Sequence, residues 1–446
     1  MQKYLFKNIL VVNEGKIEAK DVLINGERIE RVDNVIEVTG NVTEINGEGK
    51  HLLPGAIDDQ VHFREPGLTH KASIYSESKA AVAGGVTSFM EMPNTIPNAL
   101  TLNLLEDKYE IARQTSLANY SFFMGVSNDN AEEVLRINKL KNNVCGVKIF
   151  MGSSTGNMLV DNHSTLNRIF SESEVLIATH CEDERIIRKN YEAFKQSGIE
   201  LSAKDHPLLR NEDACFESSL IAIQFAKKYN SRLHILHIST QKELQLFSNM
   251  LPLKEKRITA EVCVHYLHFT ADDYERLGYK IKCNPAIKAA HNKEALWEAL
   301  LDDRLDVIAT DHAPHLLSEK EGTYLQAHAG LPLVQHSLAL MLYYHSIGKI
   351  SLEKMVEKMS HAVADCFLIK ERGYIKEGFY ADLVMVDLKK PTIVTPNNIY
   401  YKCGWSPLQN FTLPASIEQT MINGNTVYAN GSFNESYKGK RLSFCR

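Results

Sequence analysis

The sequence predicts an α/β fold: a (β/α)8 barrel of the TIM type, joined to a small β-sandwich domain built from both chain ends. Two observations predict the barrel. Between about residues 53 and 366, short apolar runs alternate with longer amphipathic stretches, as they do in βα units. Eight such alternations in about 310 residues also match the size of this barrel. The β-rich sequence pattern of both chain ends predicts the second domain.

The two chain ends consist of short β-rich runs separated by turn signals. Four Asn-Gly dipeptides, which favour hairpin turns, mark these runs. They begin at Asn25, Asn46, Asn423 and Asn430. We therefore expect one composite β domain from residues 1–52 and 370–446, and the barrel from residues 53–369.

Eight apolar runs are the expected barrel strands. In chain order they span residues 51–59, 86–92, 120–126, 146–150, 174–180, 233–238, 258–263 and 306–310. Between them lie stretches with the amphipathic pattern of helices. The clearest of these stretches span residues 73–85, 102–114, 215–229 and 292–302. This alternation predicts a parallel sheet covered by helices.

The composition excludes several classes of protein. Hydrophobic residues make up 44% and charged residues 24%, as in ordinary globular proteins. The 50 Lys and Arg against 55 Asp and Glu give a net charge of −5, without the basic excess of a nucleic-acid binder. No apolar stretch approaches the roughly 20 residues that span a bilayer, and the first residues lack a secretory signal pattern. The eight scattered cysteines suggest reduced thiols. We expect a cytoplasmic protein.

Polar side chains lie within or after the carboxyl-terminal parts of most expected strands. They are Gln60, His62, Asn94, Lys148, His180, His237, Asn284 and Asp311. Each has an ordinary explanation by itself, such as a hydrogen-bonded histidine, a snorkelling lysine or a capping aspartate. Active-site groups of such barrels, however, gather at the carboxyl ends of the strands. Three imidazoles, a lysine and a carboxylate would then lie at one barrel mouth, and imidazole and carboxylate are ligands that zinc accepts in catalytic sites.

Strand alternation refines this set. Gln60 and His62 are two residues apart and should point the same way. His234 and His237 are three apart and should point to opposite faces. His237 lies nearer the strand end, so we expect it to be the ligand and His234 to be structural. The residue after Asp311 should likewise point away from it.

Lys148 lies inside the apolar run Gly146–Phe150. An ammonium group cannot ligate a cation, but a neutral amine can react with carbon dioxide to form a carbamate. The carbamate is an anionic oxygen ligand able to bridge two metals. Burial favours the neutral amine because it lowers the pKa of a lysine. We therefore expect a carbamate on Lys148.

Longer motifs resemble a known family. They are HFREPGLTHK (residues 62–71), AAVAGGVTSFMEMPNTIPN (80–98), GVKIFMGSSTG (146–156), HILHIST (234–240), TAEVCVHYL (259–267), ATDHAPH (309–315) and GKRLSF (439–444). Together they are similar to the dihydroorotases of the amidohydrolase superfamily, over essentially the whole chain. The resemblance implies reversible cyclisation of N-carbamoyl-L-aspartate to L-dihydroorotate, a step of pyrimidine (UMP) biosynthesis, by a zinc-activated hydroxide.

The resemblance also implies roles for particular residues. His62, Asp311 and a carbamylated Lys148 would hold one zinc, and the same carbamate with His180 and His237 would hold a second. Asp311 would also act as the general acid/base. The residues that resemble substrate contacts are Arg64, Asn94 and His315 for the carboxylate, and Asn284, Ala329 and Gly330 for the ring.

The chain departs from the family at Gln60, where relatives have the first histidine of a His-x-His pair. A neutral amide oxygen is a poorer zinc ligand than imidazole. The sequence therefore predicts one or two zinc ions per subunit, with the position beside His62 and Asp311 the weaker. A milder departure is Lys288, where relatives often have arginine.

Two alternatives stay open at this point. Allantoinases and hydantoinases share the barrel and the metals, but their substrates lack the carboxylate that Arg64 would bind. An inactive barrel that serves as a scaffold, for instance for aspartate transcarbamoylase, is the other alternative, and Gln60 is the feature that favours it. The expected partner is a small-molecule substrate, with neither nucleic acid nor membrane. A homodimer is compatible with the sequence, which does not fix the oligomeric state.

Overall fold

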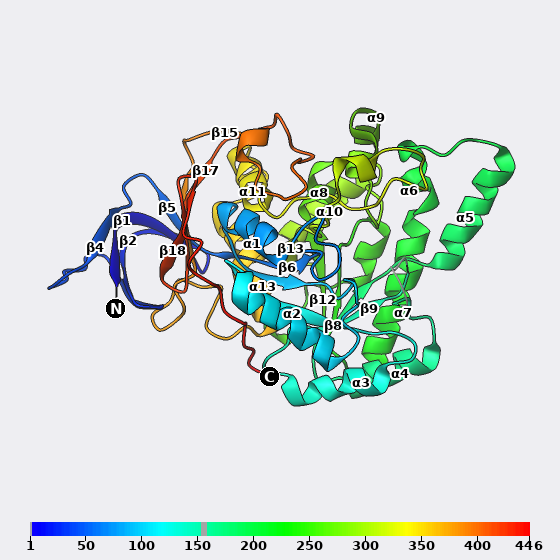
Figure 1. The fold of residues 1–446 in the computed structure, drawn as a ribbon, viewed down its shortest axis with the longest axis horizontal. Helices are drawn as coiled ribbons and strands as arrows, with labels where there is room; N and C mark the ends of the chain where they lie inside the picture. Colours follow the sequence, from blue (N-terminus) through cyan, green and yellow to red (C-terminus); the bar gives the residue numbers. More distant parts are fainter. Residues whose placement is uncertain (1, 153–157) are drawn as a thin grey trace.

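The computed structural model describes residues 2–152 and 158–446, and it confirms the predicted fold class (Figure 1). Eight parallel strands form one sheet in the order β13-β12-β11-β10-β9-β8-β7-β6. They are β6 (Ala56–Val61), β7 (Val86–Glu91), β8 (Asn119–Gly125), β9 (Gly146–Phe150), β10 (Ile177–His180), β11 (Leu233–Ile235), β12 (Ile258–Cys263) and β13 (Val307–Ala309). A bridge between Val61 and His312 closes the barrel, because it joins the end of β6 to the residues after β13.

Helices connect the barrel strands, and most of the barrel is surrounded by them (Figure 1). They are α1 (Ile74–Ala83), α2 (Leu102–Thr115), α3 (Ala131–Leu135), α4 (His163–Glu172), α5 (Glu184–Ser197), α6 (His206–Leu209), α7 (Glu212–Tyr229), α8 (Val264–His268), α9 (Tyr274–Leu277), α10 (Ala290–Leu301), α11 (Ser337–Ser346), α12 (Leu352–Val356) and α13 (Ala362–Phe367). Polar N-caps fix several starts: Ser73, Thr101 and Asn211 each accept a backbone N–H of the helix that follows. The barrel strands are almost fully buried, as expected for a parallel sheet covered by helices.

A second, nine-stranded sheet takes its strands from both chain ends. Its order is β19-β18-β17-β14-β5-β1-β2-β3, with β4 also paired to β1. The strands are β1 (Lys3–Asn13), β2 (Lys16–Asn25), β3 (Arg28–Asp33), β4 (Thr43–Asn46), β5 (His51–Pro54), β14 (Leu383–Asp387), β17 (Ser416–Ile422), β18 (Asn425–Ala429) and β19 (Ser432–Phe433). A separate short pair consists of β15 (Thr392–Ile393) and β16 (Thr412–Leu413). Figure 1 shows the blue and red ends of the chain side by side in the large sheet. The predicted domain boundaries stay a prediction.

Two local predictions are corrected by the structure. The run 51–59 is not one strand, because the chain turns at Gly55 and divides it between β5 of the second sheet and β6 of the barrel. Asn46-Gly47 is not a hairpin turn, because β4 and β5 on either side of it both pair with β1 in parallel. Gly47 instead allows the chain to pass close to Ile9, because a Cβ atom at residue 47 would lie 2.4 Å from Cβ of Ile9. The other three Asn-Gly dipeptides connect adjacent antiparallel strands.

Within residues 2–152 and 158–446, no helix is long and apolar enough to cross a bilayer. All eight cysteines are free thiols, six of them buried.

Candidate active site

A single cavity of about 230 Å³ brings together all twelve residues that the sequence analysis selected. These are Gln60, His62, Arg64, Asn94, Lys148, His180, His237, Asn284, Asp311, His315, Ala329 and Gly330. The strand-end residues reach it from the carboxyl ends of the barrel strands, where active sites of this fold lie. Phe150, Ala313 and His328 also line the cavity, and the sequence analysis did not select them. Of the motif at residues 146–156, residues 153–156 lie outside the described part of the chain.

His62 and Asp311 form one pair of candidate ligands. Nε2 of His62 lies 3.0 Å from Oδ1 of Asp311, and its Nδ1 lies 2.7 Å from Oδ1 of Asn94. If the amide oxygen of Asn94 accepts the Nδ1 proton, Nε2 carries a lone pair that faces a carboxylate oxygen. Two lone pairs at this distance require a cation between them, either a proton or a metal ion. Burial lowers the pKa of His62, which favours the neutral, metal-binding imidazole.

His180 and His237 form the second pair. Nδ1 of His180 lies 2.9 Å from Nε2 of His237, and Nε2 of His180 lies 3.0 Å from Oε2 of Glu182. A carboxylate only accepts, so the His180 proton is on Nε2 and its Nδ1 presents a lone pair to the cavity. A carboxylate behind a histidine is the usual support of a metal ligand. Arg210 in turn donates to Oε2 of Glu182 at 2.5 Å.

The sequence analysis missed Glu182, although its signal was present. Glu182 follows the expected ligand His180 by two residues, in the run His180-Cys181-Glu182-Asp183. A buried carboxylate so close to a metal-binding histidine is a candidate orienting group. Although burial opposes ionisation, Arg210 and His180 lower the pKa of Glu182 to about 2, so the carboxylate is charged.

Lys148 is fully buried, at 1% exposure, and its Nζ lies 4.5 Å from the ring centre of Phe150. Burial lowers the pKa of Lys148 to about 7, against the opposing effect of Glu261 and Asp311. A large fraction of the amine is therefore neutral near neutral pH, as carbamate formation requires. The two ligand pairs share the cavity with this amine, so the donor set fits two metal ions bridged by an anionic group on Lys148.

Three residues that line the cavity have left-handed backbone conformations. The φ angles are 68° at Arg64, 42° at His237 and 47° at Asp311. Residues with side chains rarely adopt this region, and such strain is concentrated at functional sites. The turn at His237 corrects a prediction: strand β11 ends at Ile235, so alternation does not place His234 and His237 on opposite faces. The residue after Asp311 does point away, because His312 pairs with Glu77 of α1.

A second group of possible ligands lies in the barrel interior. Ligand atoms of Asp59, His234 and Glu261, from three different strands, all lie within 4.8 Å of one another, and none of the three residues is exposed. Nε2 of His234 lies 3.1 Å from Asp59 and 3.3 Å from Glu261. Although burial acts against protonation, Cys366, Asp59 and Glu261 raise the pKa of His234 well above its usual value. The group can hold a proton or a metal ion. Glu261 also accepts the backbone N–H of His237 at 2.8 Å.

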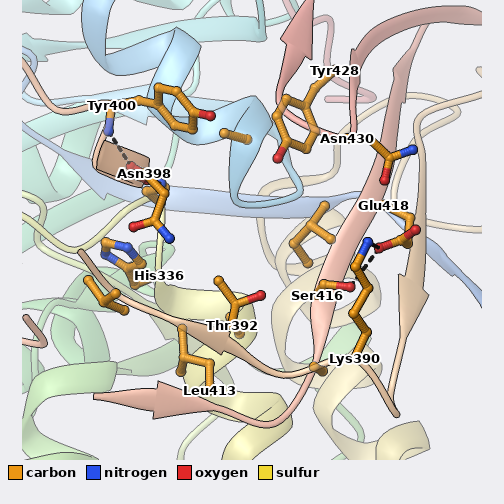
Figure 2. Close-up of a pocket in the computed structure, with 16 residues that line it drawn as sticks. His336, Lys390, Thr392, Asn398, Tyr400, Leu413, Ser416, Glu418, Tyr428 and Asn430 are labelled. Atoms are coloured by element: carbon orange, nitrogen blue, oxygen red, sulfur yellow. Dashed lines mark hydrogen bonds and ion pairs between the residues drawn. The ribbon is translucent and has the colours of Figure 1, made fainter. Parts of the chain in front are cut away.

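Figure 2 shows another cavity of about 230 Å³, between α1 and α11 of the barrel and strands β15 to β18. Lys390 and Glu418 form an ion pair of 2.9 Å at one side of it, and Tyr400 and Tyr428 lie at the other. None of the twelve selected residues lines this cavity. The residues selected from the sequence therefore line the cavity at the barrel mouth and not this one.

The chain is similar to several known proteins. The family model described as "Amidohydrolase family" matches residues 51–427. A dihydroorotase from Methanosarcina acetivorans is 31% identical over 96% of this chain and 92% of that protein. An allantoinase from Desulfitobacterium hafniense is 28% identical over 98% of each chain. The structure of an L-hydantoinase (dihydropyrimidinase) from Arthrobacter aurescens superposes with a TM-score of 0.91, at 25% identity and 97% coverage of each chain.

Proposed function

The chain belongs to the amidohydrolase family, and we propose that it is a dihydroorotase that interconverts N-carbamoyl-L-aspartate and L-dihydroorotate in pyrimidine biosynthesis. The observation that carries the proposal is the position of Arg64. Its buried guanidinium lines the same cavity as the candidate metal ligands, and burial lowers its pKa only to about 10, so it stays charged. A guanidinium suits a carboxylate, which dihydroorotate carries and which hydantoin and allantoin lack.

The proposed metal centre uses residues from five strand ends. His62, Lys148 and Asp311 would hold one zinc, and Lys148, His180 and His237 the other, with Lys148 carried as its carbamate. Support comes from the close approach of the ligand atoms within each pair and from the lowered pKa of Lys148. Zinc bound there would supply a Lewis acid that polarises the reacting carbonyl and makes a water molecule nucleophilic at neutral pH.

The other residues bind the substrate and move its proton. Asp311 would accept a proton from the nucleophile and deliver it to the ring nitrogen, and would act in reverse during ring closure. Arg64 would hold the substrate carboxylate, and His315 would lie beside that contact, since its Nε2 is 3.1 Å from Nη2 of Arg64. Asn94 would donate a hydrogen bond to the carboxylate from its amide nitrogen, because its Oδ1 is already bonded to Nδ1 of His62. Asn284, Ala329 and Gly330 line the same cavity and would contact the ring.

A direct assay tests the proposal. Ring closure consumes a carboxylate, takes up a proton and releases water, so the equilibrium should move towards dihydroorotate as pH falls. The purified protein, supplied with zinc and bicarbonate, should be offered dihydroorotate, N-carbamoyl-L-aspartate, hydantoin and allantoin. We expect turnover of the first two. Absence of conversion in both directions would refute the proposal. Turnover of hydantoin or allantoin alone would show that the protein is a hydantoinase or an allantoinase instead.

The allantoinase and hydantoinase among the similar proteins make cyclic-amide hydrolysis of another ring the second candidate. The buried Arg64 argues against it, since neither ring has a carboxylate to neutralise this charge. The inactive-scaffold alternative has less support, because the five proposed ligands and Arg64 all line one cavity. A cytoplasmic location and a homodimer stay predictions.

A further inference from the structure

A buried lysine lies outside the active-site cavity, behind the side of the cavity that Arg64 and His315 line. Lys71, the last residue of the motif HFREPGLTHK, is 5% exposed. Its Nζ lies 3.0 Å from Nδ1 of His315 and 2.8 Å from Oε1 of Glu319. Lys71 does not line the cavity itself. Any effect of Lys71 on a ligand must therefore pass through His315.

The contact with Lys71 determines which nitrogen of His315 carries the proton. An ammonium group has three donors and no acceptor, so Nδ1 of His315 must accept with its lone pair. Burial, followed by the charges of Arg64, Lys320 and Lys71, holds the pKa of His315 well below its usual value, and the ring is neutral. The single proton of the neutral ring is therefore on Nε2.

A second contact leads independently to the same tautomer. Nε2 of His315 lies 3.0 Å from the carbonyl oxygen of Ala329. A carbonyl oxygen only accepts, so this contact is a hydrogen bond only when Nε2 carries the proton. The ring thus donates to the loop that lines the cavity and accepts from the lysine behind it.

This tautomer decides what Arg64 can bind. Nη2 of Arg64 lies 3.1 Å from Nε2 of His315, but two N–H groups cannot form a hydrogen bond with each other. The guanidinium is anchored from its other side, where Nε donates to the carbonyl of Pro314 at 3.2 Å. Nη2 is therefore left to donate to an acceptor in the cavity. With the opposite tautomer, the lone pair on Nε2 would accept a hydrogen bond from Nη2 of Arg64. Nη2 would then not be available to a ligand in the cavity.

We propose that Lys71 is a positioning residue that fixes the His315 tautomer and thereby keeps the Arg64 guanidinium available for the carboxylate of the substrate. The inference rests on the proposed function, because that function supplies the carboxylate. Glu319 has a different part: it balances the charge of Lys71 and lies too far from Nδ1 of His315, at 3.8 Å, to bind it.

The tautomer can be measured without any substrate. In protein labelled with 15N-histidine, the chemical shifts of ring nitrogens distinguish Nδ1–H from Nε2–H, and the His315 signals are those lost in His315→Gln. We expect Nε2–H in the unmodified protein and in Lys71→Arg, which retains a donor without an acceptor. Lys71→Met should give Nδ1–H or a mixture, because the charged donor Nη2 of Arg64 then competes with the Ala329 carbonyl for Nε2 of His315. Glu319→Gln and the partly exposed control Lys79→Met should leave the tautomer unchanged.

Kinetics supply the second readout. In Lys71→Met, KM for dihydroorotate should rise by about 10–100-fold, the loss expected when a charged hydrogen bond to the substrate is weakened. The value of kcat should change by less than about threefold and the metal content should not change, while Lys71→Arg should restore most of the affinity. A lysine with only a structural role would lower stability without this separation of KM from kcat.

Two results would overturn the inference. One is Nδ1–H at His315 in the unmodified protein, or an unchanged tautomer in Lys71→Met. The other is a changed tautomer with an unchanged KM. Failure of the proposed function is a separate outcome, since it would appear as absence of dihydroorotate turnover in the unmodified protein, whatever the tautomer.

Discussion

The side-chain nitrogen of Gln60 lies 3.2 Å from Oδ1 of Asp311, the same oxygen that lies 3.0 Å from Nε2 of His62. A carboxylate only accepts, so Gln60 turns its N–H towards Asp311 and its Oε1 towards Sγ of Cys263, 3.7 Å away. The residue that replaces a histidine of the family thus orients Asp311 and does not offer its oxygen to the position beside His62.

This contact predicts two metal positions of unequal affinity. The position at His62 and Asp311 should release zinc first, whereas the one at His180 and His237 should retain it. Gln60→His should tighten the weaker position, because imidazole is the better zinc ligand. A chelator titration with metal analysis should show two steps in the unmodified protein and one in Gln60→His. Loss of both metals together from the unmodified protein would contradict the prediction.

Lys148 should show a pH-dependent reaction with bicarbonate. Burial lowers its pKa to about 7, so the neutral amine becomes the main form as pH rises through that value. Carbamate on the metal-free protein should therefore increase between about pH 6 and about pH 8 and then level off. Carbon-13 NMR with labelled bicarbonate measures it, and Lys148→Arg is the control that cannot react. An absence of the signal at every pH would exclude the carbamate.

Glu182 should strengthen metal binding through His180. Replacing it in Glu182→Gln removes the charge that receives the Nε2 proton of His180. Metal affinity at His180 and His237 should fall by about 10–100-fold, as is usual for the loss of such a supporting carboxylate. Competition with a chelator measures the affinity. Glu172→Gln, an exposed change at the end of α4, should have no effect, and an equal affinity in both variants would disprove the role of Glu182.

Arg64 should determine the preference for a substrate with a carboxylate. Arg64→Ala should cost about 2–4 kcal/mol in kcat/KM for dihydroorotate, because the carboxylate loses a charged partner. Arg64→Lys should recover part of this loss, since an ammonium group keeps the charge without the planar fork. The metal content should stay the same in both variants. If activity in Arg64→Ala stays within about threefold, another residue binds the carboxylate.

A buried ion pair should support the end of strand β6. Lys108 and Glu91 are both about 1% exposed and pair with each other, and Glu91 also accepts the backbone N–H of Phe63 at 3.1 Å. Lys108→Met should lower the free energy of unfolding by about 3–5 kcal/mol, because it leaves the Glu91 carboxylate buried without a cation. Adding Glu91→Gln should restore part of that loss and keep the acceptor for Phe63. Urea unfolding measures both variants.

The sequence by itself determined the barrel and the composition of its mouth. Apolar runs and amphipathic stretches are local patterns, and they follow from which faces of a strand or helix are buried. The selection of His62, His180 and Asp311 followed from their places at strand ends, because all parallel strands of a barrel present their carboxyl ends at one mouth. Arg64, His315, Ala329 and Gly330 were selected from the family resemblance, and they line the same cavity.

Only the tertiary structure decided how these residues act on one another. The contact of Gln60 with Asp311 joins residues 251 positions apart, and that of Lys71 with His315 joins residues 244 apart. The direction of a side chain at the end of a strand was also unpredictable, because strand β11 ends at Ile235 and His237 beyond it has a positive φ, so the alternation on which the sequence argument relied does not reach His237. Hydrogen-bond partners and proton positions depend on which atoms distant strands bring within about 3 Å, and a local sequence pattern does not contain that information.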